Sequence, residues 1–301
     1  MIRKRNRWRT GRMNLQRSVW KKIGILCYVA MVIAVLSPIP VSASNKISVS
    51  VDAKRAIIMD METEEVLYGK HIREKCENAS TTKLLTAITA VEKTSLKKKV
   101  RISGNVIRTE PTCYRFRQGD TYYMKELLHA TLIMSANDAA VAVAEGSSGS
   151  VNRFLKQANA KAKKMGCKNT HFATVNGLHT DQKHYTTAYD MAKIIKYAYS
   201  IPQLRNIMKK SGYTVKSTTG RKKKVESTNV LLKSKKYYCV GKTGTGSVAR
   251  YCFAGVYTYR KHPYVLVVFG CSKEENRWKD IKHMINACRK YQDQAEQAPI
   301  Q

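Results

Sequence analysis

Hydrophobic and polar residues recur along this chain with periods that divide it into a helical middle part flanked by strands. Two short β-type runs, 56–60 and 65–68, surround a polar turn over 61–64. Between 81 and 93 the apolar residues have the spacing of one helix face. They are Leu84, Leu85, Ile88 and Val91. The chain after its first 50 residues therefore predicts a strand pair followed by a helix that faces a core.

Helical signals dominate the next hundred residues. Further helices are predicted over 125–134, 138–145 and 150–165 and from residue 187 onward. Ser150 is suited to cap the third of these segments, and Gly166 follows it as a stop signal. Thr187 and Asp190 have the spacing of a capping box, with Asp in place of the usual Glu. These signals indicate a block of short, capped helices.

After Tyr213 the period of the pattern changes to that of strands. Strands are predicted over 213–217, 225–228, 238–243, 251–259 and 264–271, and an amphipathic helix over 279–289. Strands at both ends with helices between them favour an α+β fold. We expect one sheet that includes the N-terminal strands, a helical insert, and a terminal helix packed on the sheet.

The composition adds a large basic excess to this picture. The chain has 301 residues, of which 55 are Lys or Arg and 21 are Asp or Glu, so its formal charge is +34. With 43% hydrophobic residues the composition is that of a globular protein, which excludes a disordered chain. A charge of this size indicates a polyanionic surrounding: nucleic acid, an anionic membrane face or an acidic cell wall.

The N-terminus separates these possibilities. Residues 1–22 contain nine basic residues and no acidic one, an apolar run follows over 23–36, and small residues at Val41 and Ala43 form a cleavage site. This pattern predicts a secretory signal peptide over residues 1–43. The alternative is an uncleaved signal anchor, favoured by the long basic leader. The apolar run of 14 residues is shorter than the roughly 20 residues that span a bilayer, which favours cleavage.

The predicted export limits the polyanionic surroundings that can explain the positive charge. Removing the nine leader charges from +34 leaves +25 on the remaining 258 residues. We expect a protein outside the cytoplasm, in the cell wall or at the outer face of the cytoplasmic membrane, which contacts the membrane only through an uncleaved leader. Nucleic-acid binding is not expected, and no zinc-finger spacing or basic heptad repeat indicates it. The predicted organisation is a signal peptide, a catalytic domain over 44–290 and a polar tail over 291–301.

Cysteine usage indicates neither a disulfide scaffold nor a zinc site. Seven cysteines follow the leader, an odd number, and the chain contains no C-x-x-C and no H-E-x-x-H string. We expect free, mostly buried thiols. A single bridge between Cys239 and Cys252, on neighbouring predicted strands, is the alternative.

Three short strings could carry chemistry, although each is weak alone. A Ser three residues before a Lys occurs at Ser80 at the start of the first strong helix, where the two side chains face the same side. A Ser-x-Asn string at 135–137 interrupts two helices, where polar side chains can project into a cleft. Lys-Thr-Gly occurs once, at 242–244, where Gly244 would let a ligand backbone lie against the strand end.

In this order, the strings at 80–83, 135–137 and 242–244 resemble the three signatures of penicillin-binding proteins and class A β-lactamases. Longer segments are similar to the D-alanyl-D-alanine carboxypeptidase family of low-molecular-weight penicillin-binding proteins. These segments are 78–87, 132–140, 175–179 and 184–192. The resemblance covers about residues 50–290. It implies a β-lactamase/transpeptidase-like α+β fold, with an antiparallel sheet flanked by helices and a helical subdomain inserted after the N-terminal strands.

The chain departs from the family pattern at three places. The family commonly has Pro, Gly and often Asp where this chain has Asn78, Ala136 and His179. These positions are peripheral to the chemistry, so they concern substrate fit and not mechanism.

The resemblance also implies roles for individual residues. Ser80 is the nucleophile and Lys83 its base, which must be neutral to act; burial and the nearby Lys242 lower its pKa. Ser135 relays a proton to the leaving D-alanine. The implied substrate-binding residues are Asn137 for the substrate amide, Lys242 and Thr243 for its carboxylate, and Gly244 and Thr245. The main-chain N–H groups of Ser80 and Thr245 form the oxyanion hole.

The implied substrate is a peptidoglycan stem peptide that ends in D-Ala-D-Ala, and β-lactams are implied as covalent inhibitors. The enzyme would be a serine-type carboxypeptidase that removes the terminal D-alanine through an acyl-Ser80 intermediate in cell-wall biogenesis. No metal or organic cofactor is needed. The positive surface is expected to face an anionic cell wall.

Other activities of the same scaffold stay open at this point. A D,D-endopeptidase or transpeptidase would use the same residues. A non-catalytic penicillin-binding sensor is disfavoured because Ser80, Lys83 and Lys242 are intact. A β-lactamase is less favoured, since no Glu-x-x-Leu-Asn string lies between Asn137 and Lys242 to activate the deacylating water.

Overall fold

The computed structural model describes residues 46–180 and 183–297. The predicted signal peptide over 1–43 and the last four residues, 298–301, lie outside the described residues. None of the helices in the described ranges is both long and apolar enough to span a membrane.

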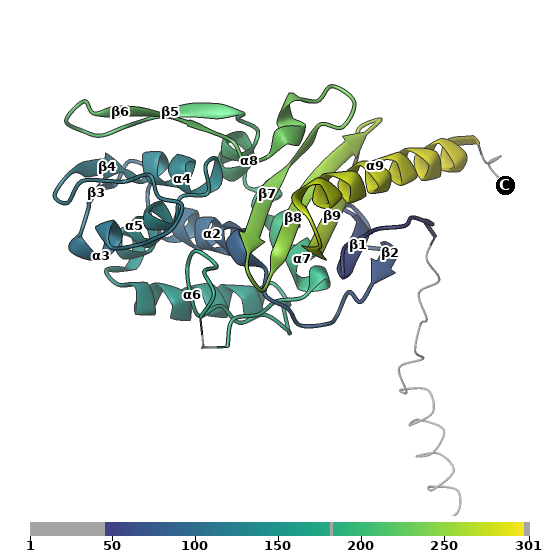
Figure 1. The fold of residues 1–301 in the computed structure, drawn as a ribbon, viewed down its shortest axis with the longest axis horizontal. Coiled ribbons are helices and arrows are strands. Elements are labelled where there is room, and N and C mark those ends of the chain that lie inside the picture. The colour runs from purple at the N-terminus through teal and green to yellow at the C-terminus, as the bar shows by residue number, and fades with distance from the viewer. Residues whose placement is uncertain (1–45, 181–182, 298–301) are drawn as a thin grey trace, which may run out of the picture. The chain divides into compact units, whose positions relative to one another are not determined.

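A five-stranded antiparallel sheet with the order β2-β1-β9-β8-β7 forms the centre of the fold (Figure 1). Its strands are β1 (Arg55–Asp60), β2 (Val66–Lys70), β7 (Cys239–Gly246), β8 (Arg250–Tyr259) and β9 (His262–Cys271). Ile57 of β1 lies opposite Val267 of β9, so the N-terminal and C-terminal strands meet in one sheet. This confirms the predicted α+β arrangement.

Helices cover both faces of this sheet. α9 (Glu274–Gln297) packs on β8 and β9 from one side, and α7 (Ala188–Ser200) packs on β1, β8 and β9 from the other (Figure 1). The pleat of β9 explains the two cores, because successive side chains point to opposite faces. Val267 belongs to the larger core with the helical lobe, whereas Leu266 and Val268 belong to the smaller core under α9.

The helical lobe is inserted between β2 and β7. Besides α7, its helices are η1 (Ala79–Thr82), α2 (Lys83–Lys93), α3 (Gly104–Ile107), α4 (Met124–Leu132), α5 (Asn137–Ser148), α6 (Val151–Lys164), α8 (Pro202–Met208) and η2 (Val230–Lys233). α2 is buried among α4, α5, α6 and α7, and η1 at its start packs on β7. The lobe and the sheet therefore meet at the N-terminal end of α2.

The predicted helix signals occur where expected. Ser150 Oγ accepts a hydrogen bond from the Arg153 N–H over 3.3 Å at the start of α6, and Gly166 follows this helix with a φ of 73°. Thr187 Oγ1 accepts from the Asp190 N–H over 3.0 Å at the start of α7. Local capping chemistry thus sets these boundaries.

The structure corrects two predictions, about the strands after residue 212 and about the last helix, and adds one strand pair. β5 (Gly212–Lys216) and β6 (Lys222–Glu226) form a separate two-stranded sheet and do not join the main one. A further pair, β3 (Lys99–Arg101) and β4 (Thr121–Tyr123), was not predicted, because three-residue strands carry almost no periodic signal. α9 extends beyond 279–289 in both directions and includes most of the predicted polar tail.

Contacts with the sheet explain why this polar segment continues the helix. The Tyr259 hydroxyl donates to Asp293 Oδ1 over 3.1 Å, and the Tyr264 hydroxyl donates to Gln292 Oε1 over 2.5 Å. Side chains of β8 and β9 thereby hold the last turns of α9 in place, a tertiary contribution that helix periodicity does not reveal.

All seven cysteines of the described ranges are free, as predicted. The alternative bridge between Cys239 and Cys252 is wrong, because the β7–β8 register places Cys239 opposite Tyr257 and Cys252 opposite Gly244. The two thiols therefore lie near opposite ends of the ladder.

Candidate active site

Ser80 lies in η1, the short 3₁₀ helix that leads directly into α2. Lys83, the first residue of α2, donates a hydrogen bond from Nζ to Ser80 Oγ over 2.7 Å. Ala79, the residue before Ser80, has a φ of 45°, a conformation that residues with a Cβ rarely adopt. Asn78 Nδ2 donates to the hydroxyls of Thr81 and Thr82 over 2.8 and 3.0 Å. These contacts hold the strained turn and keep Ser80 against Lys83.

Lys83 is fully buried, and each of its polar contacts is with a residue of a different element. Besides Ser80, its Nζ contacts Asn137 Oδ1 over 2.7 Å and the Asn176 carbonyl over 2.9 Å. Burial first, and then the charge of Lys242, hold the pKa of Lys83 well below its usual value. In the neutral amine two hydrogens can donate to the asparagines, which leaves the lone pair facing Ser80.

The Ser-x-Asn string forms the bend between α4 and α5, so its two polar side chains face the same cleft. Ser135 has a φ of 65°, and its Oγ accepts a hydrogen bond from Lys242 Nζ over 2.8 Å. Asn137, the first residue of α5, contacts Lys83 through Oδ1 and donates from Nδ2 to the Pro111 carbonyl. This string therefore connects the two buried lysines.

Lys242 lies on β7 and is 1% exposed. Burial, followed by repulsion from Arg277, lowers its pKa to about 7. The neighbouring Thr243 hydroxyl contacts the Thr228 hydroxyl. Around these groups lies a cavity of about 300 Å³, and of the predicted residues it is lined by Ser80, Ser135, Thr243, Gly244 and Thr245. Lys83, Lys242 and Asn137 are buried beside it, so all eight predicted residues come together.

Gly244 allows β7 to approach η1 closely. A Cβ at this position would lie 2.7 Å from the Asn78 carbonyl oxygen and 3.2 Å from the Ser80 nitrogen. Any other residue would therefore push the strand away from the main chain of Ser80. The absence of a side chain keeps the Ser80 N–H beside the strand that carries Thr245.

One group of possible metal ligands exists among the described residues, and it does not line this cavity. It consists of Asp52, Cys271 and Asp280. The two oxygens of Asp280 accept hydrogen bonds from the Asp52 and Ala53 N–H groups over 2.9 and 2.8 Å. Asp52 in turn accepts from the Ser272 N–H over 2.7 Å. These carboxylates serve to fasten main-chain segments around the start of α9.

Comparison with known proteins decides the family. The sequence profile of the D-alanyl-D-alanine carboxypeptidase family matches residues 40–273. The chain belongs to this family. A D-alanyl-D-alanine carboxypeptidase of Bacillus subtilis is 32% identical over 240 residues, which cover 78% of this chain and 61% of that protein. A relative of the same description from Streptomyces is 30% identical over 234 residues, covering 72% of this chain and 79% of the relative.

Solved structures agree with the predicted fold. The crystal structure of a Streptomyces DD-transpeptidase matches with a TM-score of 0.74 and 26% identity, and the match covers 79% of this chain and 97% of that one. This confirms the β-lactamase/transpeptidase-like fold. The chain spans less than two thirds of the length of the Bacillus carboxypeptidase.

Arg277 is a cleft residue of this D-alanyl-D-alanine carboxypeptidase family member that the sequence patterns did not indicate. It is 2% exposed and lines the cavity. Its Nη1 donates to the Gly244 carbonyl and to Thr245 Oγ1, both over 3.3 Å, and its Nη2 donates to Glu274 Oε1 over 2.6 Å. It lies in the first turn of α9, the helix that follows β9, and only the sheet order brings it to β7.

Two further positions of the site were not indicated by the sequence either, because only the tertiary structure brings them to it. The Asn176 carbonyl holds Lys83 although it belongs to the loop before α7, and Thr228 lies in the cavity wall beside Thr243. The sequence of the segment 175–179 indicates only a similarity to the family. A main-chain carbonyl has no residue-type signal, so no pattern could have found it.

Proposed function

We propose that this chain is a serine-type D-Ala-D-Ala carboxypeptidase that removes the terminal D-alanine from peptidoglycan pentapeptide. The observation that carries the proposal is the contact of 2.7 Å between Ser80 Oγ and a fully buried Lys83 whose pKa is strongly lowered. A serine hydroxyl needs a base to become a nucleophile, and a neutral lysine at hydrogen-bond distance is such a base.

Acylation follows from this pair. Neutral Lys83 takes the Ser80 proton while Oγ attacks the carbonyl carbon of the penultimate D-alanine. The main-chain N–H groups of Ser80 and Thr245 stabilise the oxyanion, and one such donor is typically worth roughly 3 kcal/mol of the barrier. When the peptide bond breaks, the proton passes through Ser135 to the amine of the leaving D-alanine. The product is an ester between the peptide and Ser80.

Deacylation reverses the roles of the groups. Lys83 takes a proton from a water molecule, the resulting hydroxide attacks the ester carbonyl, and the proton returns to Ser80 Oγ as the bond breaks. The peptide leaves one D-alanine shorter with a new carboxylate. Every step is a proton transfer or an acyl transfer between the substrate, water and these side chains.

The substrate should need a free terminal carboxylate, because basic side chains lie beside the cavity. Lys242, Thr243 and Arg277 present two positive charges and a hydroxyl around one cavity. A bound carboxylate would favour the charged form of Lys242, whose pKa is about 7 in its absence. Asn137 would orient the substrate amide.

The natural setting that we propose is the cell wall, outside the cytoplasm. The charge of +25 on residues 44–301 fits an anionic wall. β-Lactams, which mimic the scissile amide, would acylate Ser80 and stay bound, because the sequence has no Glu-x-x-Leu-Asn string to support rapid hydrolysis. The domain over 44–290, freed from a signal peptide over 1–43, would carry the activity.

The test is D-alanine release from a soluble pentapeptide ending in D-Ala-D-Ala. We expect release by the unchanged protein and none by Ser80→Ala. The matched control is Ser95→Ala, because Ser95 also precedes a lysine by three residues but lies exposed outside the cleft. Release that survives Ser80→Ala, or that Ser95→Ala abolishes equally, would contradict the mechanism. Rapid turnover of a labelled penicillin would contradict the carboxypeptidase assignment in favour of a β-lactamase.

A further inference from the structure

A second pocket lies at the end of β7 that is remote from the catalytic serine. It has a volume of about 450 Å³ and is formed by the ends of α7 and α8, the segment before β7, the ends of β7 and β8, and α9. We call it the Tyr/Lys pocket after residues that line it, Tyr199, Lys209, Lys235, Lys236, Tyr238 and Arg289. Tyr238 precedes Lys242 by four residues, about 13 Å along an extended strand. The two sites are therefore separate.

The lining of the Tyr/Lys pocket is positively charged and contains no carboxylate. Arg289 is fixed at its base, where Nε donates to the Tyr257 hydroxyl over 2.6 Å. Lys209 and Lys235 are exposed and form no ion pair with any residue in the described ranges. An anionic ligand would meet one oriented guanidinium and several flexible ammonium groups.

Tyrosine rings provide the second kind of contact. Tyr238 is 40% exposed, although it is a large side chain, and Tyr199, which also lines the pocket, is half-buried. Tyr257 and Tyr259 also line the pocket, and the Arg289 guanidinium lies 5.6 Å from the centre of each of their rings. Aromatic faces carry negative charge, so they attract the polarised C–H faces of sugar rings.

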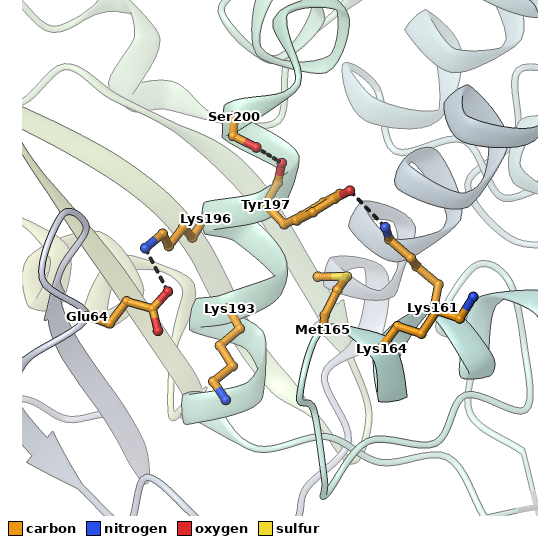
Figure 2. Close-up of a pocket in the computed structure, with 8 residues that line it drawn as sticks. All are labelled: Glu64, Lys161, Lys164, Met165, Lys193, Lys196, Tyr197 and Ser200. Carbon is orange, nitrogen blue, oxygen red and sulfur yellow. Dashed lines mark hydrogen bonds and ion pairs between the residues drawn. The ribbon is translucent and has the colours of Figure 1, made fainter.

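Another lysine-rich pocket shows why several lysines alone are not sufficient to indicate a binding site for an anionic ligand. Figure 2 shows Lys196 directed at Glu64, and Lys161 directed at the Tyr197 hydroxyl. Lys196 pairs with Glu64 over 2.7 Å, and Lys161 pairs with Glu92 over 2.6 Å. Half of the lysines of that pocket are already neutralised by the protein, and it presents only one aromatic ring.

We propose that the Tyr/Lys pocket binds an acidic saccharide, in which sugar rings stack on the tyrosines and a carboxylate group contacts the lysines and Arg289. The rings distinguish this ligand from a polyol phosphate polymer, which has charge but no ring to stack. This inference goes beyond the proposed peptidase activity and does not depend on it. The pocket would hold a wall-type glycan while the cleft remains free.

Binding can be measured by isothermal titration calorimetry on the protein carrying Ser80→Ala, at low ionic strength. The probe is a hyaluronan tetrasaccharide, which contains N-acetylhexosamine and carboxylate-bearing rings. Chitotetraose provides similar rings without acid groups, and glycerol 3-phosphate provides charge without rings. We expect the hyaluronan fragment to bind at least about tenfold more tightly than either, since charge-assisted hydrogen bonds add to stacking.

Variants of the lining residues test whether the hyaluronan fragment binds at the Tyr/Lys pocket. Lys235→Ala/Lys236→Ala and, separately, Tyr238→Ala should each weaken hyaluronan binding about tenfold or more. The control Lys97→Ala/Lys98→Ala removes two exposed lysines elsewhere and should leave binding unchanged. In protein with Ser80 intact, none of these changes should alter D-alanine release from a soluble pentapeptide. Equal weakening by the control, equal binding of chitotetraose, or tighter binding of glycerol 3-phosphate would overturn the proposal.

Discussion

At the scale of single residues, the cleft depends on two buried lysines with different roles. Lys83 contacts Ser80, whereas Lys242 contacts Ser135 and has its pKa lowered by burial and then by repulsion from Arg277. Burial lowers the pKa of both, and the charge of Lys242 lowers that of Lys83 further. The sequence strings predicted this pairing. The strings did not indicate the Asn176 carbonyl, because its contribution is independent of residue type.

The coupling of the two lysines can be tested by removing one charge. In Lys242→Met the repulsion on Lys83 disappears, so the pKa of Lys83 should rise. Because the proposed mechanism needs Lys83 in its neutral form, the acidic limb of the pH profile for Ser80 acylation should move to higher pH. The measurement is the rate of labelling by a fluorescent penicillin between pH 5 and 10.

Because Lys242→Met also removes a contact of Ser135, the rate itself should fall, and the position of the limb is the informative quantity. Lys97→Met, at an exposed lysine, should leave the limb unchanged. A limb that stays in place or moves to lower pH in Lys242→Met would show that Lys242 does not act on Lys83.

Arg277 provides a second test at this scale. If its guanidinium contributes to carboxylate binding, Arg277→Gln should lower kcat/KM for a peptide with a free C-terminus by roughly 30-fold, since a hydrogen bond to a charged group contributes about 2 kcal/mol. A peptide amide should be affected much less. Arg250→Gln, at an exposed arginine on β8, is the control. Equal losses for the acid and the amide would mean that Arg277 has only a structural role.

At the scale of elements, the position of η1 depends on neighbours that approach without side chains. Gly244 of β7 lies against it. Gly177 also lies against η1, with a φ of 81° and a hypothetical Cβ only 1.9 Å from the Ala79 carbonyl oxygen. The loop that contains Gly177 also supplies the Asn176 carbonyl to Lys83. A change in this loop should therefore displace Lys83.

Gly177→Ala should displace the loop or η1 and so reduce acylation of Ser80 by about tenfold or more, because misplacement of reacting groups is costly. Gly149→Ala is the matched control, since Gly149 has a φ of 78° and nothing within 4 Å of its hypothetical Cβ. The control carries only backbone strain of about 1 kcal/mol. Penicillin labelling rates and thermal unfolding of both variants distinguish the effects. Equal acylation rates would show that the loop does not position Lys83.

The elements themselves were largely predictable from the chain. Helices with caps, such as those that begin after Ser150 and Thr187, have local signals that the fold retains. The long strands near the C-terminus were also found. The assignment of β5 and β6 to their own sheet could not be found, because strand partners depend on tertiary packing and not on the period of a segment.

At the scale of the whole molecule, a buried histidine should make the free energy of unfolding depend on pH. His184 is 7% exposed, its Nε2 contacts Thr82 Oγ1 over 3.0 Å, and its ring stacks on Phe172. Burial lowers its pKa from 6.5 to about 4. The folded protein therefore keeps this ring neutral at pH values where the unfolded chain takes up a proton.

The free energy of unfolding should consequently decrease as the pH falls from 6.5 to 4. The contribution of His184 to this decrease is up to roughly 3 kcal/mol, from 1.4 kcal/mol for each pH unit of difference. Urea unfolding at pH 7 and pH 4.5 measures it, and His184→Gln should show a smaller decrease. His283→Gln, at an exposed position of α9, should behave as the unchanged protein does. An equal decrease in His184→Gln would exclude this group as the cause.

The sequence by itself determined which residues are candidates for the chemistry of this protein: Ser80 with Lys83, the Ser-x-Asn string at 135–137 and the Lys-Thr-Gly string at 242–244. It did so because these groups occur as short strings whose residue types and order are specific. Only the tertiary structure decided how Arg277, Thr228 and the Asn176 carbonyl join them. The physical reason is distance along the chain, since the antiparallel order of the sheet places the start of α9 beside β7. The same order separates the Tyr/Lys pocket from the cleft and makes it a site of its own.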